Sequence, residues 1–449
     1  MNAGHTRADC GNNIAFGIGE IAGRRQREDG GKAVSRPGPG KGREVVVPAA
    51  SLSAFKTLGI RDFRFLLPSN SLTLAGQQLR LMAQGWLVLE LTNQTVWVGL
   101  ANGLPTLVGV PLAMLSGVMT DRMNPRTLLL QVRLLLGVTA FVTALLVGAG
   151  LIELWHVLLL AIAAGGLQAY GLPASQTFVY DLVGRDRLLG ALALGSMVQY
   201  GSNLIAPPLA GYLMGRYGIE AGFYLLTVLF AGAVVSLLFV RSGKPAERPE
   251  KRSLLAEFVD GIDYVRRAPH VAALLFLASL AVFGAAFLAI LPAYARDVLH
   301  VGAGGFGLLT GAQGAGALIT SLWLSRRGNI SRKGRSVVMA ATVWGGGMVV
   351  FGLSRSYGLS LATLAIMGAS TPFWLVALNT ALQTTVPENM RGRVLAMYTT
   401  VFQAVPLGFV VGGLLSALMG EMAALLACGM VFTALNVAAY AKSRALRGV

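Results

Sequence analysis

Residues 221–240 read AGFYLLTVLFAGAVVSLLFV and contain no charged side chain. A helix needs about 20 mostly apolar residues to cross the roughly 30 Å hydrocarbon core of a bilayer, so this stretch predicts a membrane span. The residues that follow, 241–270, form the longest polar interruption between apolar runs. Similar apolar runs, separated by short polar loops, continue on both sides of this interruption.

Apolar runs of span length recur along the chain after residue 65. Counting them gives twelve predicted spans, at about 66–90, 95–118, 127–149, 154–177, 190–215, 221–240, 271–295, 304–325, 336–354, 358–381, 394–419 and 421–441. The chain is 54% hydrophobic and only 13% charged, whereas soluble domains carry roughly 25% charged residues. We therefore predict an all-α membrane protein with twelve transmembrane helices.

The basic residues indicate how these spans are oriented. The net charge is +17, but Lys and Arg cluster in short loops rather than on one solvated face, which argues against nucleic-acid binding. Of the 37 Lys and Arg residues, 21 lie in every second loop and at the C-terminal end, whereas the loops between these hold three. Because positively charged loops stay in the cytoplasm, we expect both termini to be cytoplasmic and the number of spans to be even.

The polar stretches divide the chain into regions. We expect a disordered basic cytoplasmic tail at 1–55, a six-helix bundle at 56–240, a cytoplasmic linker at 241–270, a second six-helix bundle at 271–441 and a cytoplasmic tail at 442–449. Helical spacing of apolar residues from Leu254 to Val265 predicts an amphipathic helix on the membrane surface, with a solvated linker helix as the alternative. The N-terminal tail either belongs to the mature protein or reflects a start assigned too far upstream.

Two segments about 200 residues apart are similar to each other. Residues 181–211 read DLVGRDRLLGALALGSMVQYGSNLIAPPLAG, and residues 384–413 read TTVPENMRGRVLAMYTTVFQAVPLGFVVGG. In each, a Val and a pair of basic residues precede a helix rich in Gly and Pro; the second pair is Arg391 and Arg393. Internal repeats of this kind are the usual way in which transporters place a site at mid-membrane.

These segments, and the loop GVMTDRMNPR at 117–126, resemble the major facilitator superfamily. Gly117, Asp121, Arg122 and Arg126 look like its cytoplasmic gating motif, in which the Gly lets two helices approach closely. The Asp is expected to cap a helix and the Arg to bridge to the neighbouring bundle. Asn124 replaces the family's usual Gly, which we interpret as a left-handed position that Asn also tolerates.

Three further stretches resemble, within that superfamily, the branch of enterobactin exporters and drug-efflux carriers. They are residues 58–100, FVDGIDYVRRAP at 258–269 and VPENMRGRV at 386–394. The resemblance covers about residues 56–440. It implies two six-helix bundles with pseudo-two-fold symmetry around a central cavity, in the bacterial cytoplasmic (inner) membrane. In that fold the third, sixth, ninth and twelfth helices are peripheral and should be the least polar.

Polar side chains inside the apolar runs are the candidates for a substrate cavity. In the first span Asn70, Thr73, Gln77, Arg80 and Gln84 follow the spacing of one helix face. Arg80 should face a wet cavity or a partner, because a buried Arg costs about 2.5–3.5 kcal/mol on insertion scales. The other candidates, each of which could instead make only an interhelical hydrogen bond, are Gln168, Gln176, Gln199, Asn203, Asn379 and Gln403.

The resemblance implies secondary active transport of a small amphipathic molecule by alternating access, and most directly export of a drug-like or siderophore-like compound. Proton coupling is implied by the resemblance alone, because the spans contain no mid-span carboxylate that would indicate it. Glu90 and Asp181, at span ends, are the candidate coupling acids, and capping or interfacial roles are the alternative for both. We expect no metal and no cofactor, with a proton gradient as the energy source. We expect the protein to be a monomer whose partners are the substrate and the lipid bilayer.

Other functions remain as alternatives at this point. The protein could import a metabolite or facilitate its uncoupled movement, or it could be a non-transporting receptor or lipid-handling protein of the same fold. An enzyme is not expected, since the four His residues lie outside or at the rims of spans. The run GAGGFG at 302–307 matches a dinucleotide fingerprint only formally; it is better interpreted as a turn before a small-residue helix face that includes Gly307 and Gly311.

Overall fold

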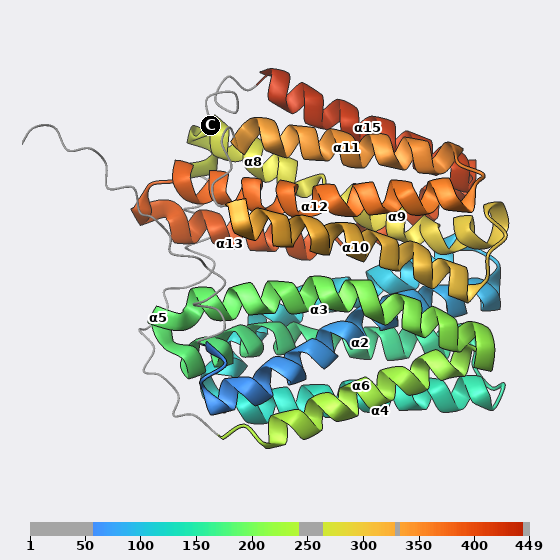
Figure 1. Ribbon diagram of the computed structural model, residues 1–449, viewed down its shortest axis with the longest axis horizontal. Coiled ribbons are helices and arrows are strands. Elements are labelled where there is room, and N and C mark those ends of the chain that lie inside the picture. Colours follow the sequence, from blue (N-terminus) through green and yellow to red (C-terminus); the bar gives the residue numbers. More distant parts are fainter. Residues whose placement is uncertain (1–56, 242–263, 328–332, 443–449) are drawn as a thin grey trace, which may run out of the picture. The chain divides into compact units, whose positions relative to one another are not determined.

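The computed structural model describes residues 57–241, 264–327 and 333–442, and within them not the side chains of 113–122, 185–186, 189 and 388–389. The described residues form helices joined by short turns, without a β-strand among them (Figure 1). The first half contains α2 (Arg61–Thr92), α3 (Thr95–Arg122), α4 (Pro125–Gly148), α5 (Leu154–Tyr217) and α6 (Ile219–Leu238). The second contains α8 (Pro269–Ser279), α9 (Val282–Ala293), the π-helix η1 (Tyr294–Val298), α10 (Ala303–Arg327), α11 (Lys333–Leu353), α12 (Tyr357–Thr385), α13 (Glu388–Ala404), α14 (Leu407–Met419) and α15 (Glu421–Lys442).

Helix α5 consists of two spans that meet at Gly184. This residue has φ 68° and ψ 177°, a backbone conformation that favours glycine, and the two helices join across it. At 1.5 Å per residue, 64 helical residues would extend about 96 Å, far beyond a bilayer of about 30 Å. The chain therefore doubles back near Gly184 (Figure 1), and residues 154–183 and 185–217 are separate spans.

Each of the predicted spans coincides with a helix or with helical segments in direct succession. Nine stretches of the described residues are long and apolar enough to cross a membrane. Helix α2, helix α10 and the second part of α5 are not among the nine. Their glycines, amides and charged residues lower their hydropathy, and several of these glycines and amides face the neighbouring half or the cavities between helices.

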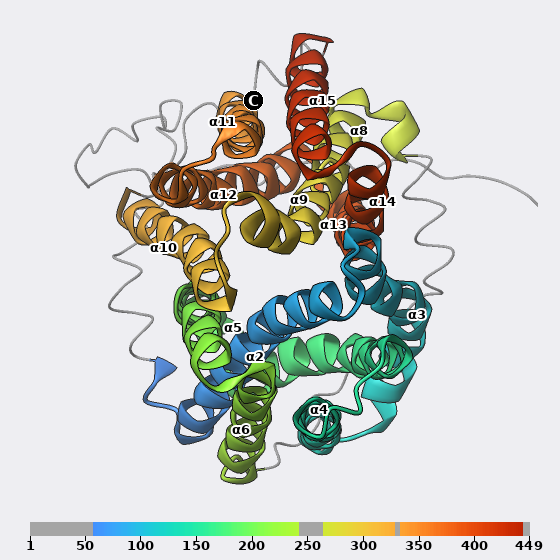
Figure 2. The same ribbon diagram turned by 90° about the vertical axis from the view of Figure 1, so that its right-hand side faces the viewer.

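The two halves contact each other mainly through two pairs of helices, α5 with α10 and α3 with α14. Helices α4 and α6 pack within the first half, and α11 and α15 within the second, so that all four lie at the periphery (Figure 2). These are the third, sixth, ninth and twelfth spans, and the prediction of their position is confirmed. The all-helical, two-bundle fold is likewise as predicted.

Small residues allow the two halves to approach closely. A Cβ atom at Gly307 of α10 would lie 2.5 Å from the carbonyl oxygen of Pro207 on α5, and one at Gly311 would collide with the ring of Pro208. On the other side, a Cβ at Gly99 of α3 would collide with the carbonyl oxygen of Phe409 on α14. The interpretation of α10 as carrying a small-residue face is therefore confirmed, and this face packs against Pro207 and Pro208 of α5.

The helices end at two opposite ends of the bundles. One end, here called the Arg296 end, holds the turns at 93–94, 149–153, 218, 299–302, 354–356 and 420. Figure 2 looks onto this end. The other, the Arg126 end, holds the turns at 123–124, 184 and 386–387. The predicted N-terminal tail and nearly all of the predicted amphipathic linker helix lie outside the described residues.

Candidate transport site

A cavity between the helices, called the main cavity here, has a volume of about 640 Å³. Its wall is formed by α2, α4 and both parts of α5, with Leu375 of α12 from the other half. It extends toward the Arg126 end as far as Phe63 and Leu188. Its polar lining consists of Asn70, Thr73, Gln77, Arg133, Gln168, Ser175, Gln176, Tyr180, Ser196, Gln199 and Tyr200. Most of the remaining lining residues are leucines and valines, so the cavity is amphipathic.

A smaller cavity of about 230 Å³, called the central cavity, lies between the two halves. It is lined by Gln78, Asn102 and Asn203 from the first half and by Thr310 and Gln313 from the second. Tyr200 lines both cavities, so the two are neighbours. The main cavity lies within the first half, and the central cavity lies at the interface between the halves.

The structure brings together six of the ten predicted cavity residues. Asn70, Gln77, Gln168, Gln176 and Gln199 line the main cavity, and Asn203 lines the central one. They come from α2 and from both parts of α5. Gln199 donates to Asn203 over 3.3 Å, which connects the two sets.

The other four predicted residues lie elsewhere. Arg80 and Gln84 border a separate small cavity of about 20 Å³ among α2, α4, α5 and α6, where Arg80 donates to Gln84 over 3.0 Å. Gln84 is buried and donates to the carbonyl of Ala101 on α3. Asn379 on α12 donates to the Tyr398 hydroxyl over 2.9 Å, and Gln403 on α13 is exposed and lines neither cavity.

The predicted cavity residues did not include Arg133 on α4, which is the charged residue among the described side chains that line the main cavity. It is 2% exposed, and its Nη2 donates to Asn70 Oδ1 over 2.6 Å while its Nη1 donates to Ser69. Asn70 also accepts a hydrogen bond of 3.3 Å from Ser175. The signal was present in the sequence, since an Arg eight positions into an apolar helix is costly unless it faces water or a partner.

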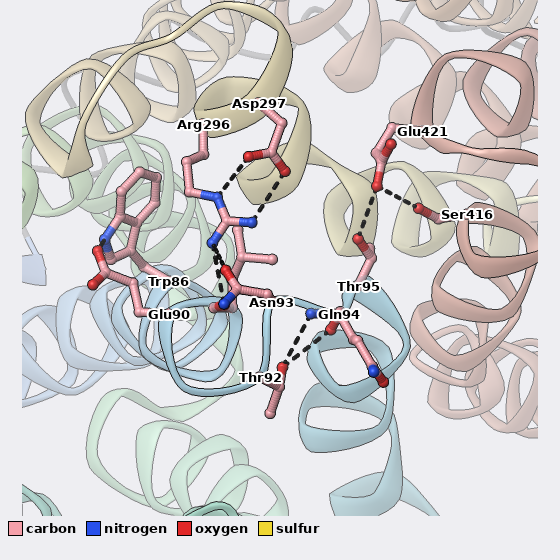
Figure 3. A network of polar contacts seen from close by, with 11 residues as sticks. Trp86, Glu90, Thr92, Asn93, Gln94, Thr95, Arg296, Asp297, Ser416 and Glu421 are labelled. Atoms are coloured by element: carbon pink, nitrogen blue, oxygen red, sulfur yellow. Dashed lines mark hydrogen bonds and ion pairs between the residues drawn. The ribbon is translucent and has the colours of Figure 1, made fainter.

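A polar network connects the two halves at the Arg296 end (Figure 3). Nη1 of Arg296 donates to Asn93 Oδ1 over 2.8 Å and to the carbonyl of Leu89 over 3.3 Å, which joins η1 to the end of α2. Nε of the same guanidinium lies 2.7 Å from Oδ1 of Asp297 and forms an ion pair with it. Thr95 at the start of α3 donates to Glu421 of α15 over 3.3 Å, and Ser416 donates to the same oxygen. These contacts join the two halves at the Arg296 end.

The predicted coupling acid Glu90 belongs to this end. Its side chain is exposed and accepts a hydrogen bond of 2.7 Å from Nε1 of Trp86. Trp86 in turn stacks on Phe306 of α10, with ring centroids 5.7 Å apart, so Glu90 is connected to a contact between the halves. Asp181, the other candidate, lies on α5 one turn before Gly184 and is half-buried.

The predicted gating motif lies at the Arg126 end. The side chains of Gly117, Asp121 and Arg122 are outside the described residues, but Arg126 donates to the carbonyl of Leu238 over 2.9 Å and so contacts the end of α6. Asn124 has φ −64° and its side chain accepts from the Arg126 backbone over 3.0 Å. The left-handed interpretation of Asn124 was therefore wrong, and this residue is the N-cap of α4.

The other two residues predicted for the gating motif, Arg391 and Arg393, lie at the start of α13. Arg393 Nη1 contacts the sulfur of Met390 at 3.4 Å, one helical turn away. Arg391 has a buried Nε without a hydrogen-bond partner in the described part of the chain.

Comparison with known proteins places this geometry in context. A family model described as a transmembrane secretion effector matches residues 52–446. The chain is 28% identical over 327 residues to an enterobactin exporter of Citrobacter koseri, covering 69% of this chain and 74% of the relative. It is 26% identical over 340 residues to YfiS of Bacillus subtilis, an uncharacterized MFS-type transporter, covering 73% and 79%.

Solved structures show the same fold. The nucleoside transporter NupG superposes with a TM-score of 0.68 at 13% identity, covering 86% of this chain and 100% of NupG. A bacterial homologue of the human lysosomal transporter Spinster, in an inward-facing unoccupied conformation, gives a TM-score of 0.62 at 14% identity, covering 88% and 96%. At such identities the similarity establishes the fold and not the substrate.

Proposed function

Since the chain belongs to the transmembrane secretion effector family, in the exporter branch of the major facilitator superfamily, we propose that it exports a small amphipathic molecule from the cytoplasm by alternating access. The protein is a multi-pass membrane transporter and not an enzyme. Beyond the transporter family, we propose the direction of transport, the kind of substrate and the energy source. The proposal also includes the cytoplasmic membrane as the location and cytoplasmic positions for both termini.

The observation that carries the proposal is the asymmetry between the two ends. The main cavity extends from mid-membrane toward the Arg126 end, which the distribution of Lys and Arg assigns to the cytoplasm. At the opposite end, the Arg296 and Thr95 contacts join the halves. This asymmetry supports the proposal, because an exporter takes up its substrate from the cytoplasm in a state that is open toward that side.

Release on the other side requires these contacts to break while the halves rotate about the substrate. The glycine contacts of α5 with α10 and of α3 with α14 run along the interface and would act as the surfaces on which the halves move. Hydrogen bonds at the rim are worth about 0.5–1.5 kcal/mol each. A few of them can therefore make the state with these contacts the more populated one, and a substrate that binds the other state more tightly can reverse this balance.

We also propose that a proton gradient drives export, with Glu90 and Asp181 as candidate carriers. Glu90 is supported by its position, because its hydrogen bond to Trp86 connects its protonation state to the stacking of Trp86 on Phe306 in the other half. No cofactor is invoked. A single chain contains both cavities, which supports function as a monomer.

The test is accumulation in efflux-deficient bacteria that express the chain, with fluorescent amphipathic dyes of positive, zero and negative charge. Export predicts lower accumulation of at least one dye, and treatment with a protonophore should restore it. Higher accumulation would establish import instead. Unchanged accumulation of every dye, at matched membrane abundance, would contradict export of amphipathic compounds.

A further inference from the structure

The main cavity contains a positive charge without a negative partner. Arg133 is buried at 2% exposure on α4 and lines the cavity. Within the described residues, the side chains that line this cavity include no Asp or Glu, and the partners of the Arg133 guanidinium are the neutral groups of Ser69 and Asn70. A charge in such a place normally has a counter-charge or opens onto water.

The neutral partners do not use the full bonding capacity of the guanidinium. It has five N–H donors in a planar fork, and the Nε of Arg133 has no hydrogen-bond partner among the described residues. Ser69 and Asn70 hold the fork in place from α2, and Ser69 itself donates to the carbonyl of Ala233 on α6. The charge is therefore held in position by neutral groups, which do not neutralise it.

A second donor in the same cavity also lacks a partner. Nε2 of Gln168, on the first part of α5, is buried and has no hydrogen-bond partner in the part of the chain that is described. The buried atoms of Arg133 and Gln168 that lack a partner in the described part of the chain, Nε and Nε2, are thus both donors. A ligand that satisfies them must bring acceptors, and a ligand that neutralises Arg133 must bring a negative charge.

We infer that the substrate of the proposed export is an organic anion: an apolar body with an acidic group that binds between Arg133 and Gln168. This inference rests on the proposed function and specifies its substrate class. Carboxylate, sulfonate and phosphate all match the planar fork of arginine, whose two parallel N–H donors favour such groups over a single acceptor. The apolar body would lie against Leu74, Leu172 and Leu375.

Binding to the purified full-length chain tests the inference independently of transport. The probes are three acids, each paired with its neutral primary amide: 1-naphthoate, indole-3-acetate and decanoate. The midpoint of thermal unfolding is followed by tryptophan fluorescence as the concentration of each probe rises. We expect acids to bind more tightly than their amides, and Arg133→Gln to weaken the acids about tenfold to a hundredfold while leaving the amides unchanged.

Two variants separate recognition from a purely structural role of Arg133. Ser69→Ala removes one hydrogen bond to the guanidinium but keeps the charge, so it should lower stability and retain the preference for acids. Arg355→Gln removes a positive charge at the exposed rim and should change neither. If Arg133→Gln fails to fold, Arg133→Lys and Gln168→Leu take its place, and both should weaken acids more than amides.

Several outcomes would overturn the inference. They are an equal response of the wild-type chain to acids and amides, a preference for acids that persists in Arg133→Gln, and equal weakening of both classes in the replacement variants. The result is distinguishable from failure of the export proposal. Acid binding that depends on Arg133, without any flux in cells, would keep the anion site and reject transport of these compounds.

Discussion

Arg296 of η1 donates a hydrogen bond to the side chain of Asn93, the residue that ends α2 in the other half, over 2.8 Å. Asn93 has φ 52°, a left-handed conformation that Asn accepts more readily than most residues, and this conformation ends the helix at the point where its side chain meets the guanidinium. One residue therefore both caps a helix and contributes to the closure between the halves.

Removal of this contact should favour opening at the Arg296 end. Arg296→Ala loses its two hydrogen bonds to the first half, worth together about 1 kcal/mol at this partly exposed site, so we expect roughly fivefold more of the open state. A Thr310→Cys substitution in the central cavity reports the change through its labelling rate with an impermeant maleimide. Arg355→Ala, at the same end, is the control. Equal labelling in both variants would show that Arg296 does not hold the gate.

The candidate coupling role of Glu90 has a matched control in the same bundle. Glu153 accepts a hydrogen bond of 2.7 Å from Trp155, as Glu90 does from Trp86, but Trp155 stacks on His156 of its own half. We expect Glu90→Gln to abolish stimulation of flux by a proton gradient while gradient-free counterflow persists, and Glu153→Gln to behave like the wild type. Reconstituted liposomes measure both rates. Full stimulation in Glu90→Gln would reject this role for Glu90.

Close packing of α5 against α10 should make Gly307 sensitive to a single methyl group. A Cβ there would lie 2.5 Å from the Pro207 carbonyl oxygen, and overpacking of this kind costs about 1–3 kcal/mol. We expect Gly307→Ala to reduce flux about tenfold at unchanged membrane abundance. Gly346→Ala on α11 is the control, because a Cβ there has no neighbour within 4 Å. Normal flux in Gly307→Ala would show that the interface adapts.

The N-cap of α4 should contribute measurably to stability. Asn124→Ala removes the acceptor for the Arg126 backbone and is expected to cost about 1 kcal/mol, while Asn124→Asp keeps the acceptor and should cost little. The apparent midpoint of thermal unfolding in detergent checks the order of the three proteins. An unchanged midpoint in Asn124→Ala would mean that another group takes over the cap.

Hydropathy and charge predicted most of the fold because the bilayer imposes them directly. A span must be apolar over about 20 residues, and each of the twelve predicted spans coincides with helical residues. Hydropathy does not show where a single span is interrupted and divided into shorter helices. The seventh is divided into α8, α9 and η1, and the eleventh into α13 and α14 at Pro406, which has no N–H to continue the ladder.

The candidate site was predicted less completely, for a reason visible in α2. Asn70, Gln77 and Arg80 share one helix face, but what packs against that face changes along the helix. Near Asn70 it borders the main cavity, whereas near Arg80 it is covered by Leu136 and Phe230. Helical spacing fixes which residues share a face and not which neighbours meet it at each depth.

Everted membrane vesicles test the central claim most directly, because in them the cytoplasmic face points outward. Uptake of the dye with the largest response in cells should be faster into energised everted vesicles with the chain than into vesicles without it, and a protonophore should remove the difference. Uptake confined to right-side-out vesicles, with none into everted ones, would contradict export from the cytoplasm through the cavity described here.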